Sequence, residues 1–418
     1  MKESSFSTAL DFTHRSNSTA PVQRKSRVHS RRHGQQEKLH VAIFPWLAFG
    51  HILPYLEVAT FLAEKGHRVS FISTPKNLRK LPTDLPPSLT LVELPLPRVD
   101  GLPDLAESTA ELPIKRSHTL RRPTTCSSQP SQRYFSRFPR TAFPLDRGPV
   151  PRPGLDRRSQ VDRLPVQEDR RVDSRFKFVA VRSCPEFEAD PLRLLEKLYG
   201  KPVVPVGLLP PAANAAAKTK RWVELKRWLD DKKEKSVFYI GLGTEVNISP
   251  EMIVELAGGI EKSGLPFVWV VGQRPGPENI PPGFESQVAG RGYMWMGWAP
   301  QAEILAHPAI GGILSHCGWS SAIESLGQGR PLILFSGANS DQGLMGRLFE
   351  ERGVGFEVPR DEADGSFTSD SLAQTIRRVM VEPDGEQVRA NAWAMREIFG
   401  NYELQNKYLE KLAQVMLA

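Results

Sequence analysis

A buried strand that runs directly into a turn and a helix, at residues 309–327, constrains the fold of this chain more than any other feature. Residues 309–314 (AIGGIL) form a short apolar run with two glycines, the pattern of a buried parallel strand. The next residues, HCGWSS, predict a turn, and residues 321–327 have the apolar spacing of a helix that opens on serines. Such a helix points its unpaired N–H groups and positive dipole end at the edge of the sheet. The sequence therefore predicts an α/β fold with an anion-binding site at that edge.

The side chains around this turn have the chemistry that a nucleoside diphosphate requires. His316 and Ser321 can donate hydrogen bonds to phosphate oxygens, and Gly318 allows close approach of the backbone. Glu324 lies one turn into the predicted helix and can accept hydrogen bonds from ribose hydroxyls, as acidic residues do in dinucleotide-binding folds. These residues predict a nucleotide site.

The flanking residues extend this site and also have structural alternatives. Residues 331–335 predict the next strand, and Asp341 and Gln342 follow its C-terminal end, where ligands bind in open α/β sheets. Taken singly, Trp298 and Trp319 have the alternative of core or interface aromatics. His307 is interpreted as a structural loop histidine, and Cys317 as a small buried filler rather than a nucleophile. The occurrence of all these residues in one register favours nucleotide-sugar binding.

The window WAPQAEILAHPAIGGILSHCGWSSAIESLGQGRPLILFSGANSDQ resembles the signature of plant secondary-product glycosyltransferases, the UDP-sugar-dependent family 1 enzymes. The resemblance implies these contacts: Trp298 stacks on the uracil, Gln301 contacts the uridine, His316 and Ser321 hold the diphosphate, Glu324 binds the ribose, and Trp319, Asp341 and Gln342 hold the sugar hydroxyls. Gly243 and Thr244, in the turn after a strand predicted at 236–244, are implied as secondary diphosphate contacts, with a tight turn as the alternative.

The chain departs from the common signature in two places. Ser320 stands where asparagine is common, and the spacing from Glu324 to Asp341 is one residue longer than usual. Both departures bear on which sugar is held. Gln342 favours glucose by resemblance, so UDP-glucose is the expected co-substrate, with rhamnose and xylose open and no cofactor or metal expected.

A strand–helix–strand unit at residues 40–73 opens the chain's first predicted domain. The stretch FPWLAFGHILPYLEVATFLAEKGHRVSFIST resembles the N-terminal motif of the same glycosyltransferases, in which the histidine after glycine is the general base. That histidine is His51 here, at a turn from strand to helix. An imidazole titrates near neutral pH and can deprotonate an acceptor hydroxyl as it attacks. A histidine that merely caps a helix is the alternative.

Residues 115–175 do not fit the domain around them. They are rich in arginine, proline and serine and contain no apolar run able to form a core strand, so we expect disorder there. In the family this region carries the aspartate that pairs with the catalytic histidine, and none of Asp100, Asp104, Asp146 and Asp156 has a family-like context. An out-of-frame or mis-spliced translation is favoured over a genuine disordered insertion.

Composition narrows the class of protein further. The net charge is +8, but residues 1–39 and 115–175 together hold an excess of 14 positive charges, which leaves about −6 for the rest. This distribution gives little support to nucleic-acid binding. Three cysteines without paired spacing argue against a disulfide framework or zinc site, and no apolar run reaches the length of a membrane span. We expect a cytoplasmic monomer, with a transit peptide as the alternative for the leader.

The sequence as a whole predicts an α/β protein of the GT-B type, with two Rossmann-like doubly wound domains facing a cleft and an incomplete N-terminal domain. The predicted parts are a disordered leader (1–37), an acceptor domain (38–206), a linker (207–220), a UDP-sugar-binding domain (221–395) and a C-terminal helix that crosses back (396–418). The expected function is inverting transfer from a UDP-sugar to a hydroxyl of a small plant secondary metabolite or its glycoside. The segments GRPLILFSGANSDQGL and EVPRDEADGSFTSDSLAQTIRRVM resemble most the branch of UDP-glycosyltransferase family 91, and this resemblance implies flavonoid or terpenoid glycosides as acceptors. The alternative is an impaired paralogue that only binds UDP-sugar, or a mis-spliced product.

Overall fold

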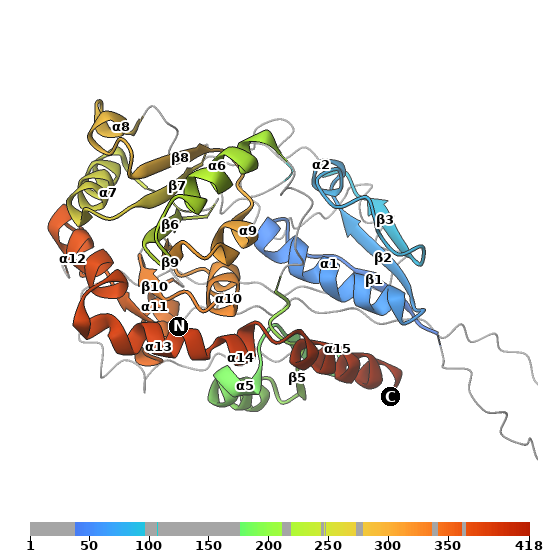
Figure 1. Cartoon of the computed structure of the whole chain (residues 1–418). Helices are drawn as coiled ribbons and strands as arrows, with labels where there is room; N and C mark the ends of the chain where they lie inside the picture. The colour runs from blue at the N-terminus through green and yellow to red at the C-terminus, as the bar shows by residue number, and fades with distance from the viewer. Residues whose placement is uncertain are drawn as a thin grey trace, which may run out of the picture. The chain divides into compact units, whose positions relative to one another are not determined.

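The computed structural model describes most of the chain and divides it into two compact units. The described residues are 38–96, 107, 176–210, 219–243, 246, 248–272, 279–336, 342–361 and 365–418. One unit holds the described residues from Pro210 to Gln405, and the other holds those of 38–96, 107, 176–209 and 406–418 (Figure 1). The predicted leader, the arginine-rich segment 115–175, most of the predicted linker, Thr244 and Asp341 lie outside the described residues.

The unit that contains the N-terminal motif is built on the predicted strand–helix–strand arrangement. Strands β1 (His40–Ile43), β2 (Arg68–Ser73) and β3 (Leu89–Glu93) pair in parallel in that order, and α1 (Phe49–Glu64) connects the first two. The sequence predicts a turn at residues 50–54 and a helix at 55–65, but the helix already starts at Phe49 and includes Pro54. It ends as predicted before Gly66, whose φ of +86° is a conformation that favours glycine.

The described part of this unit also contains a short strand–helix–strand segment, one short helix and the end of the last helix. Strands β4 (Val179–Val181) and β5 (Val203–Pro205) form a parallel pair joined by α5 (Pro185–Tyr199), and α2 (Pro75–Leu78) follows β2. The C-terminal part of α15 (Tyr402–Leu417) packs into the core that contains β1 and α1, through Leu409, Leu412 and Met416. Apolar residues at helical spacing on α15 thus bury one face of the helix.

The other unit is a parallel sheet in the order β11-β10-β9-β6-β7-β8. Its strands are β6 (Val237–Gly241), β7 (Phe267–Val271), β8 (Gly292–Met296), β9 (Ile310–Ser315), β10 (Leu332–Leu334) and β11 (Gly355–Glu357). Its helices are α6 (Lys220–Asp230), α7 (Pro250–Ser263), α8 (Phe284–Gln287), α9 (Gln301–Ala306), α10 (Trp319–Gly327), α11 (Gln342–Glu351), α12 (Ser369–Met380), η7 (Pro383–Gly385), α13 (Glu386–Ala394) and α14 (Arg396–Phe399). From β6 the chain builds the sheet in one direction to β8, and then returns to the other side of β6 with β9. Adjacent β6 and β9 therefore form the topological switch point, where a doubly wound sheet binds its ligand.

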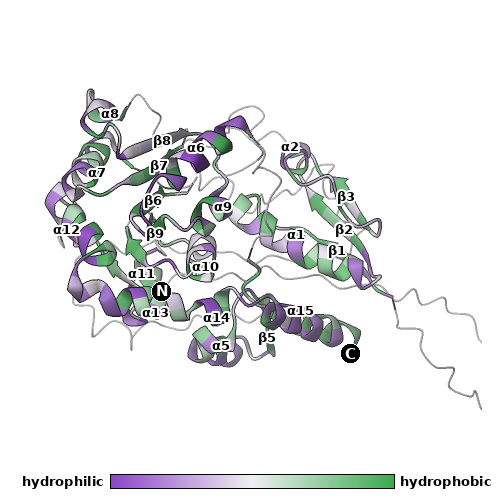
Figure 2. Cartoon of the chain, in the orientation of Figure 1, coloured by the Kyte–Doolittle hydropathy of each residue, from purple (hydrophilic) through white to green (hydrophobic). Residues whose placement is uncertain are grey.

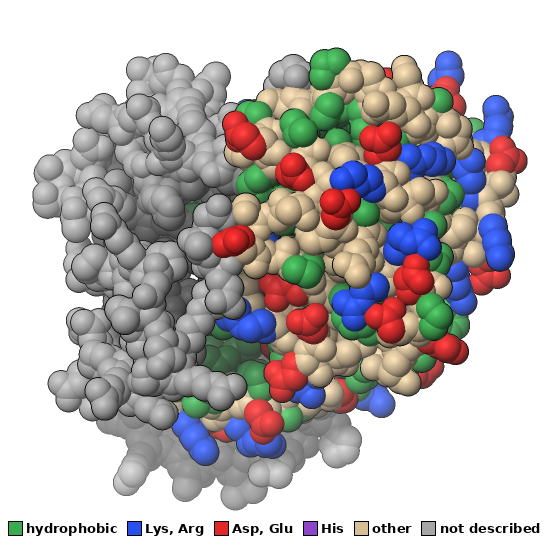
Figure 3. Space-filling model, turned by 90° about the vertical axis from the view of Figure 1, so that its left-hand side faces the viewer, with side chains coloured by type: hydrophobic (Ala, Val, Ile, Leu, Met, Phe, Trp, Pro, Cys, Tyr) green, Lys and Arg blue, Asp and Glu red, His purple; other side chains and the backbone are tan. Residues whose placement is uncertain are grey.

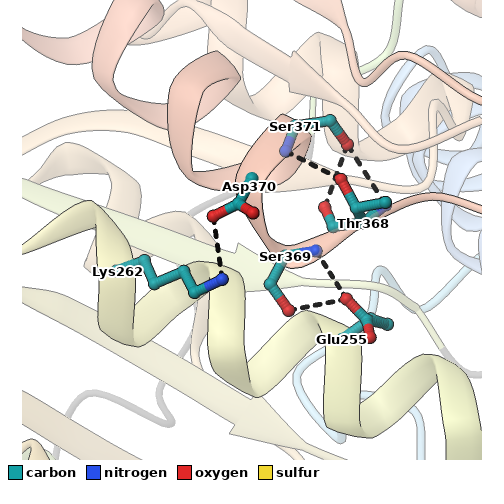
Figure 4. Close-up of polar contacts among 6 residues, drawn as sticks. All are labelled: Glu255, Lys262, Thr368, Ser369, Asp370 and Ser371. Carbon is teal, nitrogen blue, oxygen red and sulfur yellow. Dashed lines mark hydrogen bonds and ion pairs between the residues drawn. The ribbon is translucent and has the colours of Figure 1, made fainter.

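Helices α7 and α12 pack closely because two glycines of α7 face α12. A Cβ added at Gly259 would lie 2.7 Å from Cδ2 of Leu372, and one at Gly258 would lie 2.6 Å from Oγ of Ser369. Ser369 Oγ donates to Glu255 Oε2 at 2.6 Å at the start of α12 (Figure 4). A capping box between Thr368 and Ser371 and an ion pair between Lys262 and Asp370 complete the polar contacts that Figure 4 draws. The backbone N–H of Ser369 also donates to Glu255 Oε2 at 2.5 Å, and that of Ser371 donates to Thr368 Oγ1 at 3.1 Å. These two bonds satisfy N–H groups that a helix N-terminus leaves unpaired.

The pattern of hydropathy and charge is that of a protein with buried sheets. Figure 2 shows both hydrophobic and hydrophilic residues along α7 and α12. Every residue of β6 and β9 is buried. On the described part of the face in Figure 3, acidic and basic side chains are intermingled. Among the described residues, no helix combines the length and the apolar character that crossing a membrane requires.

Candidate functional site

Among the predicted site residues, Gly243 follows the carboxyl end of β6, and His316 and Gly318 follow the carboxyl end of β9. Gly241, the last residue of β6, pairs with Ser315, the last residue of β9. After β9 the chain turns through Cys317 and enters α10 at Trp319, two residues before the predicted start. The earlier start follows from the backbone, because the Ala322 N–H already donates to the Gly318 carbonyl at 3.0 Å. The strand, turn and helix predicted from the sequence are therefore confirmed at the switch point.

The imidazole of His316 is held between two glycines. A Cβ added at Gly318 would lie 2.4 Å from His316 Nε2, and one at Gly243 would lie 2.7 Å from His316 Cε1. Gly243 also has a φ of +78°, which a residue with a side chain rarely adopts. Both glycines are therefore needed for the ring to lie at this edge of the sheet.

The N-terminus of α10 lies beside this ring. Its N-cap residue is Gly318, which has no side chain that could cap the helix. The first N–H groups of a helix carry partial positive charge, so they favour an anion at this position. His316 and the start of α10 thus provide two kinds of hydrogen-bond donor at one place.

The turn residue Cys317 has a φ of +63° and is 2% exposed. Burial raises the pKa of its thiol, with a further increase from the charge of Glu357. A thiol with a raised pKa is a poor nucleophile, because the thiolate is the reactive form. This environment confirms the interpretation of Cys317 as a small buried residue.

Gln301, Ser321 and Glu324 come together through α9 and α10. The Gln301 Nε2 donates to Glu324 Oε2 at 2.9 Å and lies 3.5 Å from Ser321 Oγ. The hydroxyl of Tyr239, on β6, donates to Gln301 Oε1 at 3.2 Å. Sequence reasoning missed Tyr239, which appears in VFYIG as one more buried strand residue. The only signal was its polar hydroxyl, which needs a partner when a tyrosine is buried.

The two signature tryptophans have opposite environments. Trp298, between β8 and α9, is 66% exposed, while its carbonyl accepts from Trp295 Nε1 at 3.0 Å. Trp319 is 4% exposed, and its ring stacks on Phe349 and meets Phe399 edge-on. The side chain of Trp298 is thus largely exposed, and the ring of Trp319 belongs to the core.

Other signature residues form a structural network behind the site. His307 is 9% exposed and its Nε2 lies 3.0 Å from Asp230 Oδ1. Arg330 is buried and donates from Nε to the Leu305 carbonyl at 3.0 Å and from Nη2 to the His307 carbonyl at 3.1 Å. Burial lowers the pKa of Arg330 to about 10. These contacts bear out the interpretation of His307 as a structural loop histidine.

The remaining predicted residues are placed as follows. Ser320 is the second residue of α10, and Gln342 begins α11 and is 5% exposed. His51 lies in the first turn of α1 in the other unit and is half-buried. The four aspartates considered as its partner, Asp100, Asp104, Asp146 and Asp156, lie outside the described residues. Among the described residues, no group of three or more His, Cys, Asp or Glu side chains could hold a metal ion.

Comparisons with known proteins identify the family. The model of the family "UDP-glucoronosyl and UDP-glucosyl transferase" matches residues 195–389. UDP-glycosyltransferase 91C1 of Arabidopsis thaliana is 39% identical, over 91% of this chain and 97% of the relative. Soyasaponin III rhamnosyltransferase of Glycine max is 36% identical, over 89% of this chain and 94% of the relative. The crystal structure of Arabidopsis thaliana UGT89C1 complexed with quercetin has a TM-score of 0.70 at 22% identity, and covers 91% of this chain and 100% of that one.

The chain therefore belongs to the UDP-glycosyltransferases of the plant family 1 enzymes. The relatives 91C1, 91B1 and 91A1 of Arabidopsis thaliana are 35–39% identical to it. It has the GT-B fold of those enzymes. Its class of activity is the transfer of a sugar from a UDP-sugar to an acceptor. The fold, family and enzyme class predicted from the sequence are confirmed.

Proposed function

We propose that this chain transfers a sugar, with inversion, from a UDP-sugar to a hydroxyl of a small plant secondary metabolite or of its glycoside. The observation that carries the proposal is the convergence of His316, Gly318, Ser321 and Glu324 at the carboxyl edge of β9 and the start of α10. A diphosphate fits there because the N–H groups of the first helical turn and an imidazole can share its negative charge. The names of two relatives, soyasaponin III rhamnosyltransferase and β-D-glucosyl crocetin β-1,6-glucosyltransferase, point to acceptors that already carry sugar.

The proposed reaction follows from these roles. The acceptor oxygen forms a bond to the anomeric carbon while the bond from that carbon to UDP breaks, which inverts the configuration. His51 takes the proton of the acceptor hydroxyl as general base. UDP leaves with its electron pair, and the N-terminus of α10 and His316 stabilise its charge. Trp298 stacks on the uracil, Trp319, Asp341 and Gln342 hold the sugar, and Gly243 and Thr244 border the diphosphate.

The donor and the setting are part of the proposal. UDP-glucose is the proposed donor on account of Gln342, with UDP-rhamnose and UDP-xylose as the competing donors to test. The relative named as a rhamnosyltransferase shows why that comparison is needed. We further propose a cytoplasmic monomer without a cofactor or a metal.

The test is a transfer assay with the full chain. UDP-glucose, UDP-rhamnose and UDP-xylose are each combined with flavonoid and triterpenoid aglycones and with their monoglucosides, and products are detected by mass spectrometry. The anomeric configuration of the product is determined by NMR. Transfer to a hydroxyl with inversion supports the proposal, and retention of configuration or the absence of any UDP-sugar turnover contradicts it.

A second function, UDP-sugar binding without turnover, is favoured by one observation. The alignment with UDP-glycosyltransferase 91C1 extends over 452 residues, but 91% of this 418-residue chain is about 380 residues. Roughly 70 positions of the alignment therefore have no counterpart in this chain. Calorimetry that shows UDP binding, together with no transfer to any acceptor, would select this second function.

A further inference from the structure

Tyr239 is a buried polar residue at the centre of the second unit. It lies on β6, one of the two strands that form the switch point, and is 2% exposed. Burial, and then the nearby charge of Glu324, raises the pKa of its phenol. The phenol therefore keeps its proton, which it donates to Gln301 Oε1 at 3.2 Å. A buried hydroxyl with this single described acceptor has its direction set by the Gln301 side chain.

The amide of Gln301 has one orientation that satisfies both of its neighbours. Its Oε1 accepts from the Tyr239 hydroxyl, and its Nε2 donates to Glu324 Oε2 at 2.9 Å. The reverse orientation would place the amide oxygen against the Glu324 carboxylate, which accepts but does not donate. The hydrogen bonds to Tyr239 and to Glu324 therefore favour the same orientation of the Gln301 amide.

The backbone leaves room for this contact at one glycine. A Cβ added at Gly241 would lie 2.6 Å from Cε1 of Tyr239 and 3.0 Å from Oε1 of Gln301. Any larger residue would have to push the tyrosine and the glutamine apart. The close approach is therefore built into the end of β6, and α9 contacts both β6 and α10 (Figure 1).

We propose that Tyr239 is a positioning residue for nucleotide binding: its hydroxyl fixes the Gln301 amide, which in turn holds the Glu324 carboxylate toward the ribose hydroxyls. This inference rests on the proposed function, because it takes Glu324 as the ribose ligand. In this proposal Tyr239, which is 2% exposed, acts through Gln301 and not by contact with the nucleotide. Its effect is to restrict the rotamers of Gln301 and Glu324 before UDP binds, so that less freedom is lost on binding.

The test compares two nucleotides in one variant. Tyr239→Phe removes the hydroxyl and keeps the ring, and binding of UDP and of 2′,3′-dideoxy-UDP is measured by calorimetry. We expect a 3- to 10-fold weaker affinity for UDP and an unchanged affinity for the dideoxy analogue, which has no ribose hydroxyls for Glu324 to hold. In the Gln301→Ala background, Tyr239→Phe should have no further effect on UDP affinity.

A control separates positioning from general stability. Tyr293→Phe removes a tyrosine hydroxyl from β8 of the same sheet and should leave both affinities unchanged, and the melting temperature of each variant is recorded. Equal loss for UDP and for the dideoxy analogue in Tyr239→Phe would show a merely structural role and overturn the inference. No loss for either nucleotide would overturn it as well.

The outcomes also distinguish this inference from the proposed function. If the wild-type chain prefers UDP over the dideoxy analogue and Tyr239→Phe keeps that preference, only the inference about Tyr239 fails. If the wild-type chain does not distinguish the two nucleotides, the ribose role of Glu324 fails and this inference fails with it. If the wild-type chain binds neither, the proposed donor site itself is wrong.

Discussion

Replacing Gly318 by alanine tests the role of the glycines around His316. The φ and ψ of Gly318, −71° and 136°, are open to alanine, so the backbone conformation adds no strain. The added Cβ would lie 2.4 Å from His316 Nε2, whereas ordinary contacts begin at 3.4 Å. The imidazole must therefore retreat by about 1 Å, or the start of α10 must move.

The expected loss in UDP affinity follows from this displacement. A hydrogen bond to a charged group contributes about 1.5–3 kcal/mol, so its loss weakens binding by roughly 10- to 100-fold. Overpacking should also destabilise the fold by about 1–3 kcal/mol. Calorimetry with UDP measures the first effect and thermal unfolding the second.

Two further variants make the interpretation specific. Gly50→Ala is the matched control, because nothing lies within 4 Å of a Cβ added there. In a His316→Ala background, Gly318→Ala should no longer destabilise the fold, since the ring that it meets is gone. Wild-type UDP affinity and melting temperature in Gly318→Ala would refute the reasoning, as would an equal destabilisation in the His316→Ala background.

The remaining predictions concern the tryptophans, the helix contact and a buried thiol. Trp298→Ala should weaken UDP binding by about 1–3 kcal/mol through lost base stacking and barely change the melting temperature, because the ring is 66% exposed. Trp319→Ala should instead lower the stability by about 3–5 kcal/mol, which thermal unfolding would measure, because its buried ring packs on two phenylalanines. Gly259→Ala should lower the melting temperature despite the better helix propensity of alanine, because the new Cβ meets Leu372; an unchanged value would show that α12 can shift freely. Burial raises the pKa of Cys184 to about 12, so at pH 8 the native thiol should resist alkylation and react only in urea, as peptide mass spectrometry can follow; rapid labelling of the native chain would contradict its burial.

Periodicity and turn residues predicted much of the second unit's fold. The sequence predicts a helix at residues 250–263 and a strand at 267–272, and the structure has α7 at Pro250–Ser263 and β7 at Phe267–Val271. Both signals are local: proline at the first helical turn, glycine at the end and a run of apolar residues between turns. The short β11 and the long α5 were missed, because neither has an apolar pattern that stands out in one sequence.

The structure separates two residues that the sequence pattern treats alike. The signature makes both Trp298 and Trp319 candidate contacts, yet Trp298 is largely exposed and Trp319 lies in the core. That difference depends on Phe349 and Phe399, which lie outside the signature window. Tyr239 was missed for a related reason, since its contact with Gln301 joins residues 62 positions apart. Contacts between residues far apart in the sequence therefore determine which side chains are buried, and a local pattern does not predict them.

The most direct test of the central claim is a transfer assay and a UDP-binding measurement on the wild-type chain and on His51→Ala. The wild-type chain should transfer sugar from a UDP-sugar, and His51→Ala should bind UDP with the affinity of the wild-type chain. Turnover of the variant should fall by about 10²- to 10⁴-fold, the usual contribution of a general base. Turnover by His51→Ala at the wild-type rate would contradict the assignment of the base. UDP binding without any wild-type turnover would contradict the proposed transfer and leave a chain that only binds the donor.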